Sequence, residues 1–73
     1  MRAMKEKSHT AASLAEAIRE ARRQHGWSQE TLAEQAGVSR PTIARVEAGN
    51  DISTATLAKV AEALGLTLKV EST

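Results

Sequence analysis

Apolar residues recur every three or four positions along most of the chain, a spacing that predicts amphipathic helices. Between them, Gly37, Gly49 and Gly65 fall where the apolar pattern breaks, and glycine there suits the left-handed turn that ends many helices. The pattern predicts four helices: one from near residue 10 or 13 to about 24, then 28 to 36, 39 to 48, and 53 to 64.

Three serines stand at predicted helix starts, where a hydroxyl can accept from a free backbone N–H. An apolar residue precedes each serine and can pack against the fourth helical residue, a hydrophobic staple that fixes how the chain enters the helix. The second and third helices are only about two turns long and marginal alone, so these contacts must hold them as a rigid corner. The staples are Trp27 with Leu32 beside Ser28, Val38 with Ile43 beside Ser39, and Ile52 with Leu57 beside Ser53.

The residues after Gly65, "LTLKVE", alternate between apolar and polar and predict one short β-strand. Leu66, Leu68 and Val70 share one face. A lone strand leaves its backbone groups unpaired, so the same segment of a second copy is the expected partner, in a two-fold homodimer. The alternative is a frayed tail.

Length and composition narrow the class of protein. With 73 residues, the chain is long enough for one small domain, and it contains no cysteine for disulfides or thiolate metal sites, which suits a cytoplasmic location. No apolar run is long enough to span a membrane, so no membrane partner is expected. The predicted organisation is a flexible arm at 1–9, a helical domain at 10–65 and a dimerisation strand at 66–73.

The net charge of +1 says little about partners, but the positions of the charges say more. Residues 19 to 45 contain five arginines and three acids, whereas the residues from Ala48 onward contain two lysines and three acids. Because Trp27 is the only aromatic residue, a surface that stacks on single-stranded bases is disfavoured.

The segment from Gln29 to Gly49, "QETLAEQAGVSRPTIARVEAG", resembles the helix-turn-helix of the Cro/repressor (Xre-like) family. The similarity extends from about Leu14 to Leu66. The resemblance implies an all-α fold, a four-helix Cro/repressor-like domain, with the C-terminal β-strand pairing in a dimer. The positions that carry it are Ala33, Gly37, Val38, Ile43, Val46, Glu47 and Gly49.

The third helix has an outer face suited to a DNA groove. If Ile43 and Val46 face the core, the opposite face carries short side chains and arginines, with Arg40 and Thr42 at its flanks. Arginine bonded to guanine is the commonest specific base contact. A solvated face without a partner is the alternative. The outward residues are Pro41, Ala44, Arg45 and Ala48.

The family resemblance also implies contact residues. Ser39, Arg40, Thr42 and Arg45 are expected at the bases, and Ser28, Gln29, Thr31 and Asn50 at the DNA backbone.

Two positions depart from the family pattern. Pro41 replaces a hydrogen-bonding residue of many relatives, and either an apolar contact with a thymine methyl or its tolerance in a first helical turn explains it. The second explanation is favoured. Ala48 replaces a polar residue that is common there, so the loop after the third helix is expected to hold the DNA backbone less tightly.

A carboxylate at Glu47 opposes the helix dipole and sits poorly beside DNA, so it needs a partner. The family pattern places Arg22 opposite it and implies a structural ion pair. Arg19 and Arg23 are expected to be solvated or to face phosphate.

These observations favour a repressor that binds double-stranded DNA at a pseudo-palindromic operator. The tail resembles that of small HipB-type antitoxins, which implies an autoregulating antitoxin with a cognate toxin as a further partner. The alternatives are a protein-binding adaptor and a phage-type or restriction-modification controller. His9 and His25 lie far apart without clustered carboxylates, so neither an enzyme site, a metal site nor a cofactor is predicted, and His25 is interpreted as a helix-end residue.

Overall fold

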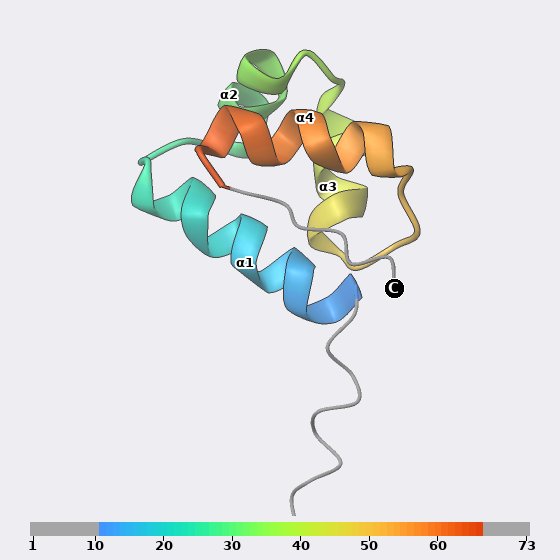
Figure 1. Cartoon of the computed structure of the whole chain (residues 1–73). Coiled ribbons are helices and arrows are strands. Elements are labelled where there is room, and N and C mark those ends of the chain that lie inside the picture. Colours follow the sequence, from blue (N-terminus) through green and yellow to red (C-terminus); the bar gives the residue numbers. More distant parts are fainter. Residues whose placement is uncertain (1–10, 67–73) are drawn as a thin grey trace, which may run out of the picture.

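The computed structural model describes residues 11–66, and every regular element in that range is an α-helix (Figure 1). The four predicted helices are confirmed, each with ends within a few residues of those expected from the sequence. None of them is long and apolar enough to cross a membrane. Their bounds are Ala11–Gln24 for α1, Gln29–Ala36 for α2, Arg40–Glu47 for α3 and Thr54–Leu64 for α4.

The three predicted N-cap serines each accept a hydrogen bond from the backbone N–H three residues later, at 3.0 to 3.3 Å. That later residue is a threonine in every case, and its hydroxyl lies 2.8 to 3.1 Å from the serine hydroxyl. Each cap is therefore closed by two hydrogen bonds, which supports short helices that would be marginal alone. The pairs are Ser28 with Thr31, Ser39 with Thr42, and Ser53 with Thr56.

The turn between α2 and α3 is fixed at both of its ends. Gly37 has a φ of 72°, in the left-handed region where a side chain is strained. The N–H of Val38 then donates to the carbonyl of Ala33 at 3.0 Å, which closes a Schellman-type helix end. Because Ser39 immediately caps α3, the angle between α2 and α3 is set by local hydrogen bonds as well as by packing.

Each helix contributes one fully buried aliphatic side chain to the core. Ile18 comes from α1, Leu32 from α2, Ile43 from α3 and Val60 from α4, and none is more than 1% exposed. The first residues of the three predicted staples, Trp27, Val38 and Ile52, are partly buried and pack against this cluster.

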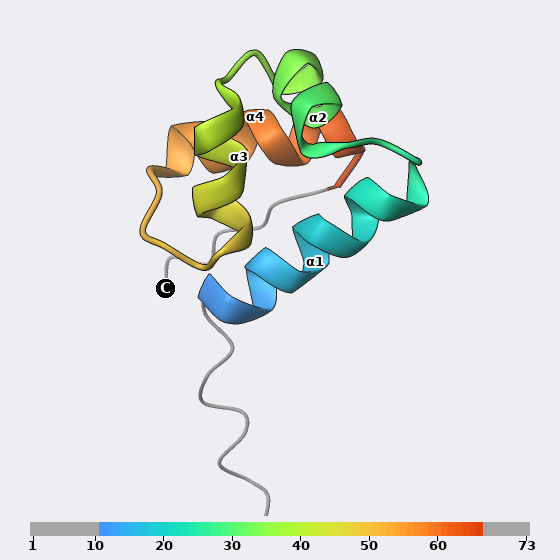
Figure 2. The same ribbon diagram turned by 180° about the vertical axis from the view of Figure 1, so that it is seen from behind.

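The helices are arranged so that α2 contacts α3 and α4, while α1 also packs against α3 and α4. Figure 1 shows α3 running steeply across the directions of α1 and α4. Turned by 180°, Figure 2 shows α3 on the near side, in front of α4. One side of α3 is therefore held by the core and the other faces outward.

The predicted N-terminal arm and most of the predicted C-terminal strand, including Leu68 and Val70, lie outside the described residues. Leu66 is described: it follows α4 and is 38% exposed, the one exposed large hydrophobic side chain in that part of the chain. The strand and the domain division remain predictions.

Replacing Ser53 by Ala should lower the free energy of unfolding by about 1 kcal/mol, because α4 loses its N-cap acceptor. Urea unfolding followed by circular dichroism measures the change. Thr54→Ala, at the neighbouring exposed position that takes no part in the cap, is the control and should change stability much less. Equal stabilities for the two variants would contradict the role of the cap.

Candidate nucleic-acid interface

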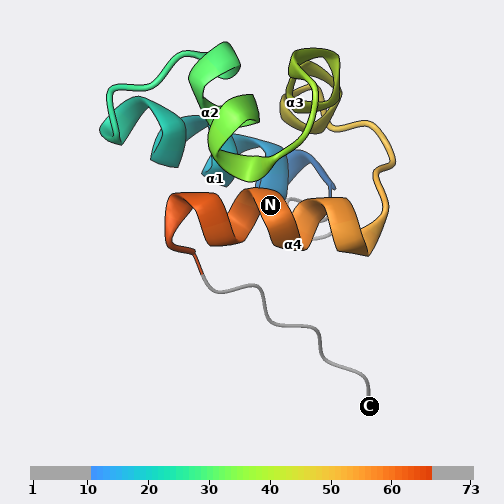
Figure 3. The same cartoon turned by 90° about the horizontal axis from the view of Figure 1, so that it is seen from above.

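The corner formed by α2, the turn and α3 presents the candidate site. Figure 3 shows α2 and α3 next to each other, above α4. On α3, the side chains of Ile43, Val46 and Glu47 are buried. Pro41, Arg45 and Ala48 are exposed and Ala44 is half-buried, as the helical spacing predicts.

Of the four residues predicted to contact bases, two are arginines with exposed side chains. Arg40 lies at the first position of α3 and Arg45 on its outer face. Within residues 11–66, no ion pair holds either guanidinium. Both arginines are therefore placed to donate to a partner outside the protein.

The other two, Ser39 and Thr42, are bonded to each other. Their hydroxyl oxygens lie 2.8 Å apart, and the Ser39 hydroxyl also accepts from the N–H of Thr42 at 3.3 Å. Thr42 is half-buried, whereas Ser39 is exposed. Capping α3 thus uses part of the hydrogen-bonding capacity that the family resemblance assigned to base contacts.

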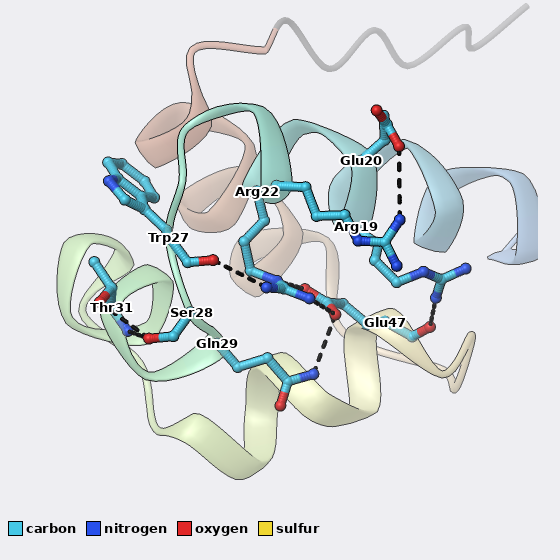
Figure 4. A network of polar contacts seen from close by, with 9 residues as sticks. Arg19, Glu20, Arg22, Trp27, Ser28, Gln29, Thr31 and Glu47 are labelled. Carbon is cyan, nitrogen blue, oxygen red and sulfur yellow. Dashed lines mark hydrogen bonds and ion pairs between the residues drawn. The ribbon is translucent and has the colours of Figure 1, made fainter.

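The Glu47 carboxylate lies at the centre of a polar network beneath the corner (Figure 4). Its side chain is 4% exposed, and that of Arg22 is 15% exposed. Arg22 binds both carboxylate oxygens, from Nε to Oε2 at 2.6 Å and from Nη2 to Oε1 at 3.1 Å. Gln29 Nε2 donates to Oε1 at 3.1 Å. The carboxylate therefore joins the end of α1 to the start of α2 and the end of α3.

Two further bonds from α1 complete the network. Arg22 Nη1 donates to the Trp27 carbonyl at 3.0 Å, and Arg19 Nη1 donates to the Glu47 carbonyl at 2.9 Å. Carbonyls in the last turn of a helix lack intrahelical donors, so the bond from Arg19 satisfies one at the end of α3. The expectation that Arg19 is solvated or faces phosphate is therefore replaced by a structural role.

Arg23 differs from Arg19 and Arg22. It is exposed and lies 3.8 Å from Glu20, one turn earlier on α1. A pair this exposed contributes little to stability.

The environment of Glu47 pushes its pKa in both directions. Burial raises the pKa, but hydrogen bonds from Arg22 and Gln29 and the charges of Arg22 and Arg19 together leave it below its ordinary value of 4.5. The hydrogen bond to Glu47 raises the pKa of Arg22, against the opposing effect of burial. Both groups are thus held in their charged forms.

The predicted backbone contacts surround the start of α2 and the end of α3. Ser28 is exposed and Thr31 is half-buried, and their hydroxyls are paired. The Gln29 side-chain amide is turned toward Glu47, so its backbone N–H, at the first position of α2, is the group better placed for an anion. Asn50 is exposed beyond α3, with its N–H donating to the Arg45 carbonyl. Phosphate contact by these residues remains a prediction.

His25 has a role that the sequence did not reveal. Its Nε2 lies 3.1 Å from the Leu64 carbonyl at the end of α4, and its ring stacks on Trp27 with centroids 4.3 Å apart. It is a helix-end residue, as interpreted, but it also connects α1 to α4. In the described part of the chain, no group of three or more His, Cys, Asp or Glu side chains could hold a metal ion.

Comparisons with known proteins agree with this geometry. A family model described as helix-turn-helix matches residues 18–70. A chain in the structure of the HipA-HipB-O2-O3 complex is similar to this one with a TM-score of 0.75 and 29% identity, over 88% of this chain and 92% of that chain. A structure named MDT Protein is similar with a TM-score of 0.73 and 31% identity, over 86% and 90%. No curated protein sequence matches.

Replacing Glu47 by Gln should lower the free energy of unfolding by about 3 kcal/mol, the low end of the cost of breaking a buried pair, since Arg22 keeps some exposure. The pH dependence should change as well. Because the folded-state pKa is depressed, the charged carboxylate stabilises the native protein above pH 4.5, and that contribution disappears as the pH falls through the folded-state pKa.

Urea unfolding across an acid pH series measures both effects, and the Glu47→Gln protein should show the flatter curve. Glu62→Gln removes a carboxylate from the exposed side of α4 and serves as the control. If Glu47→Gln and Glu62→Gln have the same stability and pH profile, the network does not hold the corner.

Proposed function

The chain belongs to the helix-turn-helix family whose model matches its residues 18–70, and on that premise we propose that it is a sequence-specific, double-stranded DNA-binding repressor that acts as a homodimer. The observation that carries the proposal is the outer face of α3. There, Arg45 stands among the short side chains of Pro41, Ala44 and Ala48, and Arg40 projects at the start of the helix.

This face suits the major groove for steric and electrostatic reasons. Small side chains let the backbone of a helix come close to the floor of the groove, and two guanidinium groups supply fork-shaped donors for guanine. The only acid on α3, Glu47, is buried and paired with Arg22, so it does not repel phosphate from the outer face. Base contacts are assigned first to Arg40 and Arg45, with Ser39 and Thr42 at the edge of the contact.

The start of α2 supports the same orientation. The exposed Ser28 and the backbone N–H of Gln29 lie where the helix dipole favours an anion, and helix N-termini commonly bind phosphate. Thr31 and Asn50 are the weaker candidates for contact with the DNA backbone. Such contacts fix the register of the protein, while the bases provide specificity.

The homodimer is proposed from the alternation of Leu66, Leu68 and Val70, of which only Leu66 is described. Its exposure at the end of α4 agrees with a partner at that end. Two copies related by a two-fold axis would place two α3 helices about 34 Å apart, one helical turn of DNA, and would bind a pseudo-palindromic operator.

A role as an autoregulating antitoxin is the finer proposal. Its support is the similarity, over 88% of this chain, to a chain of the HipA-HipB-O2-O3 complex, whose name mentions HipB together with HipA. On this basis a cognate toxin is a further partner. Co-purification of a stoichiometric protein from the native host tests that role, and its absence would favour a repressor of the phage type or a restriction-modification controller.

Arg45→Ala should weaken binding to the preferred operator by about 1–3 kcal/mol and relax the preference at one base position, because a bidentate contact with guanine is lost. The operator is first selected from random duplex DNA, and affinities are then measured at fixed salt. Lys59→Ala removes a cation from the exposed side of α4 and is the control. An unchanged affinity for Arg45→Ala would refute the assignment of α3 as the recognition helix.

Leu68→Lys should convert the dimer into a monomer, because it places a charge on the apolar face of the predicted strand. Light scattering gives the mass of the protein in solution. Thr67→Lys adds the same charge to the opposite face and should leave the dimer intact. A dimer mass for Leu68→Lys would rule out pairing through this face.

A further inference from the structure

The outer side of α3, continued by its C-cap residue Ala48, is mostly apolar. Pro41, Ala44, Arg45 and Ala48 follow one another at intervals of three, one and three residues, the spacing of a single helical stripe. The stripe extends about 10 Å along the helix. Three of its four side chains are hydrocarbon, and Arg45 is its only hydrogen-bond donor. We call these four residues the α3 stripe.

Apart from the exposed Arg40, the polar groups nearest the α3 stripe already have partners within the protein. The hydroxyls of Ser39 and Thr42 are bonded to each other, and the Glu47 carboxylate is buried. Helix α3 contains neither asparagine nor glutamine, the side chains that form paired hydrogen bonds with adenine. The hydrogen-bonding specificity of the helix therefore rests on arginine, and arginine favours guanine.

We propose that the α3 stripe recognises the C5-methyl groups of pyrimidines in the major groove, next to the guanine bound by Arg45. This inference rests on the DNA-binding function proposed above and specifies which groups of the operator that site contacts. Thymine supplies such a methyl in ordinary DNA, and 5-methylcytosine supplies the same group.

The physical reason is the cost of mismatching apolar and polar surfaces. Against the edge of adenine, cytosine or guanine, Pro41 and Ala44 would cover amino or carbonyl groups without replacing their hydrogen bonds to water. Against a C5-methyl, the same side chains remove apolar surface from water on both partners. The position of Pro41 in the first turn of α3 is compatible with this contact, because its ring is exposed there.

The test replaces each thymine of the selected operator, one at a time, with deoxyuridine. This change keeps the base pair and removes only the methyl. At the thymines next to the guanine assigned to Arg45, affinity should fall about fourfold for each methyl removed, the factor for one buried methyl-sized group. Thymines elsewhere in the operator should tolerate the replacement.

A second arm distinguishes the two sources of the methyl group. At a sensitive position, the thymine–adenine pair is replaced by cytosine–guanine with or without methylation at C5. The methylated duplex should bind about fourfold more tightly than the unmethylated one, since only the methyl differs.

Protein variants connect the effect to the α3 stripe. In Ala44→Gly, the ratio of affinities for the thymine and deoxyuridine duplexes should fall toward one at a single position. Ala58→Gly makes the same change on the exposed side of α4 and should keep the full ratio. If Ala44→Gly does not fold, Pro41→Ala provides the same comparison at an exposed position.

The outcomes separate this inference from the proposed function. If a preferred operator is selected but its affinity does not change with any deoxyuridine replacement, methyl recognition is overturned and DNA binding stands. If selection recovers no preferred duplex, the proposed function fails, and this inference fails with it.

Discussion

The arrangement of the corner formed by α2, the turn and α3 depends on the buried carboxylate of Glu47. An unpaired charge inside a small helical protein is unfavourable, so the carboxylate requires donors, and the chain supplies them from the end of α1 and the start of α2. Arg22 comes from the end of α1, Gln29 from the start of α2, and Arg19 reaches the backbone carbonyl of the same glutamate. Satisfying one buried group thereby fixes the ends of three helices relative to one another.

Local capping explains why such short helices can form this corner at all. α2 and α3 have eight residues each, near the length at which an isolated helix is unstable in water. The paired serine and threonine hydroxyls close both N-termini, and Gly37 closes the end of α2. These caps also limit the hydrogen bonds that the outer surface can offer, because the hydroxyls that cap α3 are already bonded to each other. The outer surface of α3 can still offer arginine side chains and apolar contacts to a partner.

Much of the helical fold could be predicted from the sequence, because helices, caps and turns depend on residues close together in the chain. Helical periodicity, three cap serines and the turn glycine predicted four helices, with ends correct to within a few residues. The same periodicity predicted which side chains of α3 face outward. The fate of Arg19 and His25 could not be predicted in this way, since each contacts a carbonyl more than 25 residues away along the chain. Nor does spacing reveal that the Gln29 amide turns inward, because a polar side chain at a helix start can point toward solvent or toward the domain. The recurrence of threonine three residues after each cap serine was visible in the sequence, but only the structure shows that the paired hydroxyls bond to each other.

The contact between His25 and the Leu64 carbonyl has a consequence for the architecture of any assembly built on the C-terminus. This contact ties the end of α4 to the turn after α1, so the end of that helix is held against the body of the domain. A second molecule bound through the end of α4 would therefore take a defined orientation relative to the first. In such an assembly, the distance between the two α3 helices would depend in part on the contact of one imidazole with one carbonyl oxygen, where α4 ends.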